Sequence, residues 1–244
     1  MINIFEKHAP EYRRIVRKYA LDVWHGRAGK KNFLRKVELF KRKYHADLIK
    51  HYQDKGIKIY RGTIDAKANQ WQVDQLALAE SIKVIAAAKK NKLIAQQFDE
   101  LRKTKPADVQ KMLNKIYLTS DAIASGESVY KVFSFKENFE ARAMQLGEES
   151  AFDLGSEINH AVLIESGDRY EWNTQQDKRV RDTHKKLNGK VFLYSDHPTT
   201  IDKYGKRHTG PPGTDYGCRC FESQARKKGK VWKNYVVDMS NKNK

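Results

Sequence analysis

Apolar residues recur every three or four positions through the first half of the chain, a spacing that predicts amphipathic helices. Between positions 31 and 50 the apolar stripe consists of Phe33, Val37, Phe40, Tyr44 and Leu48. The same pattern predicts helices over about 10–24, 70–101 and 106–116. The segment 56–62 alternates between two glycines, so we expect a short strand or an extended connector there.

The second half of the chain has shorter elements. A helix is predicted over 138–155, and the alternation of residues 169–173 predicts a strand. Thr174 and Asp177 form a helix-start signal, so we expect a helix from there to about Leu187, ended by Gly189. Further strands are predicted over 190–194 and 232–237, with a proline- and glycine-rich loop over 196–217.

These patterns together predict an α+β protein. A mainly helical N-terminal half is followed by a small α/β domain with a few short antiparallel strands and a long Pro/Gly loop. We expect three regions: a basic helical region over 1–118, a second domain over 119–224 and a basic C-terminal tail over 225–244.

Charge is strongly unbalanced along the chain of 244 residues, which has 48 Lys and Arg against 30 Asp and Glu, a net charge of +18. Residues 1–120 carry +15 and residues 171–244 carry +9, whereas residues 121–170 carry −6. A field of this sign favours polyanionic partners, foremost nucleic acid. We therefore predict non-specific DNA contacts at Lys30, Lys31, Arg35, Lys36, Lys41, Arg42, Lys43, Arg226, Lys227, Lys228 and Lys230.

Other classes of protein are disfavoured by the sequence. No apolar run approaches the ~18 residues of a membrane-spanning helix, and residues 1–10 lack a signal-peptide pattern, so no membrane partner is expected. Cys218 and Cys220 are the only cysteines, which excludes a disulfide framework and favours a reducing compartment. No small-molecule substrate is expected.

One group of polar residues is a candidate site. Asp177, Arg181, His184 and Asn188 would share one side of the predicted helix, and the loop after it returns Cys218-Arg219-Cys220. One interpretation is a metal site, built from His184, Cys218, Cys220 and a fourth group such as His208 or His197. The other is a buried polar network that fastens the long loop to a small core.

The order of these residues resembles a known signature. Residues 170–192, followed by 210–213 and by Cys218-Arg219-Cys220, resemble the Mu F-like phage head-morphogenesis proteins, also called minor head proteins. The shared pattern runs from aromatic-x-Trp-x-Thr through D-x-R-V-R-x-x-H and L-x-G-K-x-F to a Pro-rich loop that ends in C-R-C. The resemblance covers about 119–221 and leaves 1–118 without a recognised motif.

The resemblance implies a scaffold of residues at the matching positions. These are Trp172, Thr174, Asp177, Arg179, Arg181, His184, Leu187, Asn188, Gly189 and Phe192, closed by Pro211, Pro212, Cys218, Arg219 and Cys220.

The chain departs from its relatives where a metal would bind. Many relatives carry C-x-x-C where this chain has Arg181 and His184, in versions that look like four-ligand zinc sites. This departure favours the polar network, in which Arg181 bridges Asp177 and the returning loop. No cofactor is expected, and a structural zinc at His184, Cys218, Cys220 and His208 is the alternative.

The resemblance also implies a function. It implies a non-enzymatic minor head protein, without catalytic residues, that acts near the portal vertex inside the capsid in head morphogenesis and DNA packaging or ejection. The portal protein, the major capsid protein and the phage genomic DNA are its expected partners in the virion, after synthesis in the host cytoplasm. A basic protein beside packaged DNA neutralises phosphates without reading sequence.

Three other functions are weighed against this one. Tyr60-Arg61-Gly62 resembles the arginine motif of ADP-ribosyltransferases, although the rest of that signature is absent. His184, Asn188 and His208 are candidates for a metal nuclease. A free-standing, non-specific DNA-binding protein is the third, without helix-turn-helix or zinc-finger spacing to support it.

Overall fold

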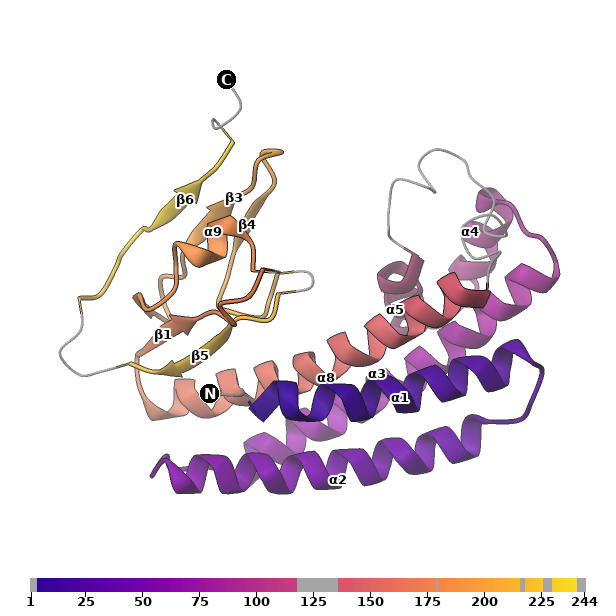
Figure 1. The fold of residues 1–244 in the computed structure, drawn as a ribbon, viewed down its shortest axis with the longest axis horizontal. Helices are drawn as coiled ribbons and strands as arrows, with labels where there is room; N and C mark the ends of the chain where they lie inside the picture. The colour runs from indigo at the N-terminus through magenta and orange to yellow at the C-terminus, as the bar shows by residue number, and fades with distance from the viewer. Residues whose placement is uncertain (1–3, 118–135, 179, 216–217, 226–229, 241–244) are drawn as a thin grey trace. The chain divides into compact units, whose positions relative to one another are not determined.

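The computed structural model describes residues 4–117, 136–178, 180–215, 218–225 and 230–240. Its helices are α1 (Ile4–Trp24), α2 (Lys30–Asp54), α3 (Arg61–Lys90), α4 (Ala95–Lys103), α5 (Ala107–Tyr117), α8 (Lys136–Ser166) and α9 (Asp182–Lys185). Its strands are β1 (Arg169–Asn173), β2 (Val191–Leu193), β3 (Thr199–Ile201), β4 (Arg207–Thr209), β5 (Phe221–Gln224) and β6 (Val236–Asp238). Helices therefore precede a small β-rich region, which confirms the α+β prediction (Figure 1).

The chain divides into two compact units. The helical unit comprises residues 6–47 and 68–151, and the β-rich unit comprises residues 1–5, 48–67 and 152–244.

The core of the helical unit is aromatic. The ring of Tyr12 on α1 lies 4.6 Å from Phe40 on α2 and 5.0 Å from Trp71 on α3, measured between centroids. The Tyr12 hydroxyl donates to Gln75 at 2.7 Å, and the Trp71 indole donates to the Ser150 carbonyl on α8 at 2.8 Å. The apolar stripe predicted for α2 is buried as expected. Burial of these faces, rather than helix propensity, supplies most of the stability of such helices.

Three predicted helices have different bounds. Helix α1 begins at Ile4 and contains Pro10, because the buried His8 ring lies 4.6 Å from Tyr44 and packs the preceding turn against α2. The helix predicted over 70–101 is two helices, since Lys92 takes a left-handed φ of 50° between α3 and α4. Helix α8 runs on to Ser166.

Gly147 is what lets α8 approach α1 within the helical unit. A Cβ at this position would lie 2.9 Å from the Cα of Arg13 and 3.0 Å from a methyl of Val16. Glycine here therefore serves close helix packing and does not end the helix.

The sequence left open whether the segment between α2 and α3 is a short strand or a connector. Residues 57–60 form a connector without a strand, and Arg61 already begins α3.

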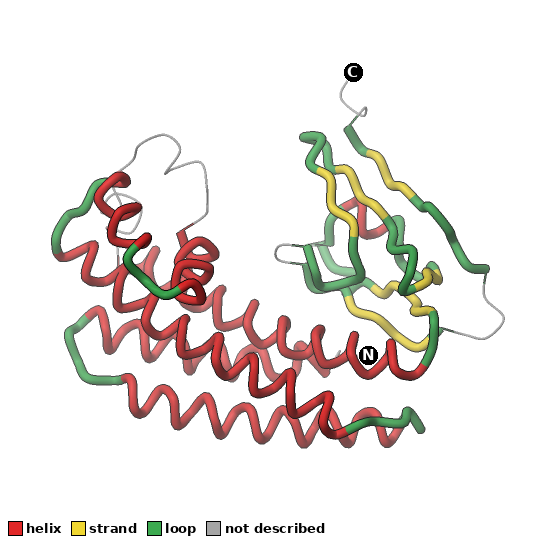
Figure 2. Tube along the Cα trace, turned by 180° about the vertical axis from the view of Figure 1, so that it is seen from behind, coloured by secondary structure: helices red, strands yellow, loops and turns green. Residues whose placement is uncertain are grey.

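The β-rich unit contains two three-stranded sheets, whose strands are yellow in Figure 2. The first has the order β2-β1-β5 and is antiparallel, with Tyr170 opposite Phe192 and Trp172 opposite Glu222. The second has the order β4-β3-β6. Its β3–β4 pair is antiparallel, but β3 and β6 are parallel, with Thr199 opposite Val236.

The second sheet corrects three expectations. Segment 196–217 is not only a loop, because it holds β3 and β4. The β3–β6 pair is parallel, whereas only antiparallel strands were expected. The last strand begins at Val236, later than predicted. Strands of three residues are too short for a period-two pattern to identify among prolines and glycines.

No helix in the described parts of the chain is long and apolar enough to cross a membrane.

Candidate functional site

The candidate site is built on β1. Its side chains alternate, so Tyr170 and Trp172 are buried while their neighbours are partly exposed. With Leu187, Phe192, Cys220 and Val237 these two rings form the core of the β-rich unit. Strand alternation thus places Tyr170 and Trp172 in the core, and Cys220 joins them from the returning chain.

The segment after β1 is not the predicted helix. Gln176 takes a left-handed φ of 56°, and only Asp182–Lys185 is helical, as α9. The Thr174 side chain does not cap a helix; its hydroxyl and its backbone N–H both donate to Asn188 Oδ1, at 3.1 and 2.9 Å. The predicted helix face of Asp177, Arg181, His184 and Asn188 is therefore wrong.

Long-range ion pairs hold this segment instead. Arg219 pairs with Asp177, and Arg181 pairs with Asp215, each across more than thirty residues of sequence. Gln175 Nε2 also donates to the Arg219 carbonyl at 3.2 Å. These contacts hold the segment 174–188 against Asp215 and Arg219 of the returning chain, and we call them the clasp. Arg181 meets the loop as expected, whereas Asp177 meets Arg219.

His184 lies at the centre of the clasp. Its Nδ1 is 3.4 Å from the Sγ of Cys218 and 3.6 Å from the Sγ of Cys220, and its Nε2 is 3.6 Å from Oδ2 of Asp215. His184 and Cys220 are buried and Cys218 is half-buried. The ring also packs edge-on against Trp172, with centroids 5.4 Å apart.

These contacts shift the pKa values of the three groups. Burial lowers the pKa of His184, but the Asp215 carboxylate and Cys218 outweigh it and raise that pKa to about 9. A hydrogen bond from Cys220 lowers the pKa of Cys218, with His184 adding to the effect, while burial opposes it. The contact with Cys218 and burial both raise the pKa of Cys220. In the absence of a metal, Cys218 is therefore the thiolate of the pair.

The other predicted site residues close the loop or lie outside the cluster. Gly213 follows Pro211 and Pro212 with φ +87°, and a Cβ there would clash with the Ser156 side chain on α8. His208, on β4, faces Thr214 Oγ1 at 3.0 Å and does not join the cluster of His184, Cys218 and Cys220. Arg179 lies outside the described residues.

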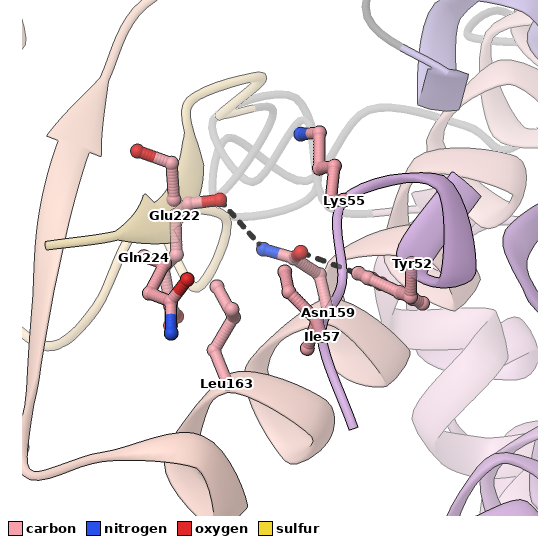
Figure 3. A pocket seen from close by; sticks show the side chains of 8 residues that line it. Tyr52, Lys55, Ile57, Asn159, Leu163, Glu222 and Gln224 are labelled. Carbon is pink, nitrogen blue, oxygen red and sulfur yellow. Dashed lines mark hydrogen bonds between the residues drawn. The ribbon is translucent and has the colours of Figure 1, made fainter. Parts of the chain in front are cut away.

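A second polar cluster, absent from the sequence predictions, surrounds the buried Glu222 on β5. Its carboxylate pairs with His160 Nδ1 at 2.8 Å and accepts a hydrogen bond from the Tyr194 hydroxyl at 2.9 Å. Asn159 donates to the Glu222 carbonyl at 2.9 Å and accepts from the Tyr52 hydroxyl at 3.0 Å, as Figure 3 shows.

Tyr52, Asn159 and Glu222 border a cleft of about 300 Å³, which is also lined by Lys55, Ile57, Leu163, Ser223 and Gln224. The hydrogen bonds link the end of α2, α8 and β5 within the β-rich unit. We therefore interpret the cluster as structural. In the structure Glu222 is the buried position of β5, and the sequence of this short strand carries no signal of that burial.

The predicted DNA-contact residues differ in their ion pairing. Within the helical unit, Lys30 pairs with Glu80, Lys41 and Arg42 with Glu38, and Lys43 with Glu11. Lys31 and Arg35 are exposed and Lys36 is half-exposed, and no ion pair among the described residues involves them. Lys230 lies 4.0 Å above the ring of Trp232. Arg226, Lys227 and Lys228 fall outside the described residues.

Comparison with known proteins finds one domain family. Residues 149–222 match the family model described as "Phage Mu protein F like protein". An uncharacterized protein of Haemophilus influenzae (strain ATCC 51907 / DSM 11121 / KW20 / Rd) is 31% identical over 84 residues, which are 34% of this chain and 17% of that protein. The chain thus matches less than a fifth of that relative's length. No solved structure matches the chain.

Proposed function

We propose that this chain, whose residues 149–222 are a Mu F-like domain, is a minor head protein that acts in phage head morphogenesis. In this role it is a structural component near the portal vertex inside the capsid, in contact with the portal or major capsid protein and with packaged DNA. The family match is the observation that carries the proposal, and it confirms the resemblance that the sequence motifs predicted.

The chemistry of the site supports a structural role. In the clasp, charged side chains of one segment pair with those of the other, as Asp177 does with Arg219 and Arg181 with Asp215. The His160–Glu222 pair is likewise engaged inside the β-rich unit. Such networks fix a long loop to its core, which suits a protein whose surface must meet partners in a defined shape.

The net charge of +18 supports proximity to DNA. Lysine and arginine neutralise phosphates and release counterions without reading sequence. On α2, Lys31, Arg35 and Lys36 can meet a phosphate backbone without giving up an ion pair to another described residue, whereas their neighbours pair with acidic residues.

The geometry supports the transferase and nuclease alternatives less than it supports a structural role. Arg61 begins the helix α3, and the sequence lacks the rest of the transferase signature. Of the nuclease candidates, Asn188 is engaged by Thr174 and His208 by Thr214, so neither is directed at His184.

Co-purification tests the proposal. The tagged full chain is produced together with the portal and major capsid proteins of the phage or prophage that encodes it. We expect portal or capsid protein to stay bound after nuclease treatment, while an unrelated protein of equal net charge releases both. A chain that stays monomeric, ignores both proteins and shows no salt-dependent DNA binding would contradict the proposal.

A further inference from the structure

Three ligand atoms converge in the clasp from separate parts of the β-rich unit. His184 comes from α9, whereas Cys218 and Cys220 come from the chain just before β5. The imidazole nitrogen and the two sulfur atoms all lie within 4.8 Å of one another. Among the described residues, this is the group of His, Cys, Asp and Glu side chains with spacing suited to a metal ion.

The distances agree with a zinc coordination shell. Zn–S bonds of about 2.3 Å and Zn–N bonds of about 2.0–2.1 Å place nitrogen and sulfur roughly 3.5 Å apart at tetrahedral angles. The observed separations from His184 Nδ1 are 3.4 Å to Cys218 and 3.6 Å to Cys220. Both sulfur atoms therefore approach this one nitrogen at distances that suit ligands of a shared metal ion. A cation at the centre satisfies both sulfurs and the nitrogen at once.

The second imidazole nitrogen of His184, Nε2, faces a carboxylate placed as an outer-shell partner of a metal ligand. Asp215 Oδ2 lies 3.6 Å from His184 Nε2, beyond hydrogen-bond distance, and Nε2 is buried without a hydrogen-bond partner among the described residues. Arg181 holds the same carboxylate oxygen from outside. A small rotation of either side chain would bring Nε2–H onto Asp215, the carboxylate–histidine–metal arrangement that fixes the tautomer of a ligating histidine.

We propose that His184 Nδ1, Cys218 Sγ and Cys220 Sγ bind a zinc ion, with Asp215 as the outer-shell partner of His184. Thiolate and imidazole together suit zinc, which takes these ligands at four-coordinate sites. Zinc takes a neutral imidazole and two thiolates, so the protons that His184 Nδ1 and Cys220 carry in the metal-free protein are released to solvent on binding. Three ligands come from the described residues, and the proposal takes water as the fourth, as at zinc sites that keep an open position.

The ligand set differs from the one expected from sequence. His208 was the fourth candidate, but it faces Thr214 on the strand β4. The bound ion would tie α9 to the chain before β5 and reinforce the clasp, independently of the role of the protein in the phage head.

The first test uses the wild-type full chain, purified gently under reducing conditions. We expect about one equivalent of zinc per chain. Metal-free protein, prepared with a chelator, should take up Co²⁺ with a sulfur-to-cobalt charge-transfer band, and zinc should displace it. Less than about half an equivalent of zinc, together with no charge-transfer band, overturns the proposal. An intramolecular Cys218–Cys220 disulfide in the freshly reduced protein, seen by intact mass, also overturns it.

Variants then assign the ligands. Cys220→Ser and His184→Gln should lose the charge-transfer band, and Asp215→Asn should keep it with zinc affinity weakened about 10–100-fold. His208→Gln is the matched control and should bind zinc as the wild type does. Circular dichroism checks that each variant is folded. Unchanged zinc affinity in a folded His184→Gln or Cys220→Ser variant, or loss of zinc in His208→Gln, contradicts the assignment.

Discussion

Glu222 shows how much one buried carboxylate organises in the β-rich unit. It is 4% exposed, and it joins His160 on α8 to Tyr194, which follows β2. Burying a carboxylate is costly unless it is paired and hydrogen-bonded, and both conditions are met here. Sequence alone offers only an acidic residue in a short strand, because the partners come from elements 28 and 62 residues away.

The pair makes a prediction about pH. The hydrogen bond that His160 donates to the Glu222 carboxylate raises the pKa of His160, against the effects of burial and of Lys67, which lower it. A raised folded-state pKa stabilises the protein below the unfolded value of about 6.5. That stability is lost as the pH rises through the folded pKa. Urea unfolding of wild type and His160→Gln should therefore differ most at low pH and converge at high pH. Parallel pH profiles of the two proteins would contradict the pairing.

Gly189 has the left-handed backbone conformation that the sequence predicted for it. Its φ of +73° is the left-handed stop expected after the helical turn, and the space around its Cβ position is open. Gly189→Ala should therefore destabilise the protein by about 1 kcal/mol, through backbone strain alone.

Gly167→Ala is the matched control for that variant. Its Cβ position is equally open, but its φ is not left-handed, so we expect almost no loss. Chemical denaturation of the two variants decides the matter, and equal losses would refute the conformational explanation.

At the scale of elements, the sequence predicted the helices and strands whose apolar residues recur in a regular pattern. The stripe of α2 and the strand alternation of β1 are both seen, since burial of one face dictates both patterns. It did not predict the two-sheet arrangement or the parallel β3–β6 pair. Strands of three residues leave no periodic signal, and their pairing depends on contacts distant in sequence.

The helix predicted over the segment 174–188 was wrong for a related reason. Thr174 and Asp177 have the local chemistry of a helix start, yet Thr174 donates to Asn188 and Asp177 pairs with Arg219. Tertiary partners here outweigh a local preference of a few tenths of a kcal/mol to about 1 kcal/mol. The motif resemblance identified which residues belong together, and the structure shows by which contacts.

The clasp predicts a measurable coupling between Asp177 and Arg219. Their side chains are 37% and 12% exposed, so solvent screens the pair only in part. A double-mutant cycle with Asp177→Asn and Arg219→Gln should give a coupling free energy of about 1 kcal/mol.

The helical pair Asp182–Lys185 is the control for this cycle. These side chains are 73% and 51% exposed, and their coupling should stay below about 0.5 kcal/mol. A coupling at Asp177–Arg219 no larger than that of the control would mean that the clasp does not fasten the loop.

At the scale of the whole molecule, charge and family point to the same setting. The basic excess lies in residues 1–120 and 171–244, on either side of the acidic segment 121–170. The Mu F-like match covers 149–222. The surface charge is readable from sequence, but which lysines are already paired is not, since Lys30 and Glu80 are fifty positions apart.

DNA binding should depend on the basic residues of α2 that lack acidic partners. Replacing Lys31, Arg35 and Lys36 by glutamine should reduce the slope of log K against log salt by about 2–3. The control variant replaces three residues of equal charge, Lys41, Arg42 and Lys43. It should reduce the slope by less than ~1, because these residues already pair with Glu38 or Glu11. Filter binding across a salt series gives both slopes. Equal reductions would mean that net charge alone, and not this face, binds DNA.

The central claim is that this chain is built into the phage head. Quantitative mass spectrometry of purified, DNA-filled heads from the phage or prophage that encodes it tests the claim most directly. We predict a few copies per head, retained through nuclease treatment and high-salt washing of the particles. Its absence from washed heads that contain portal and capsid protein in normal amounts would contradict the account.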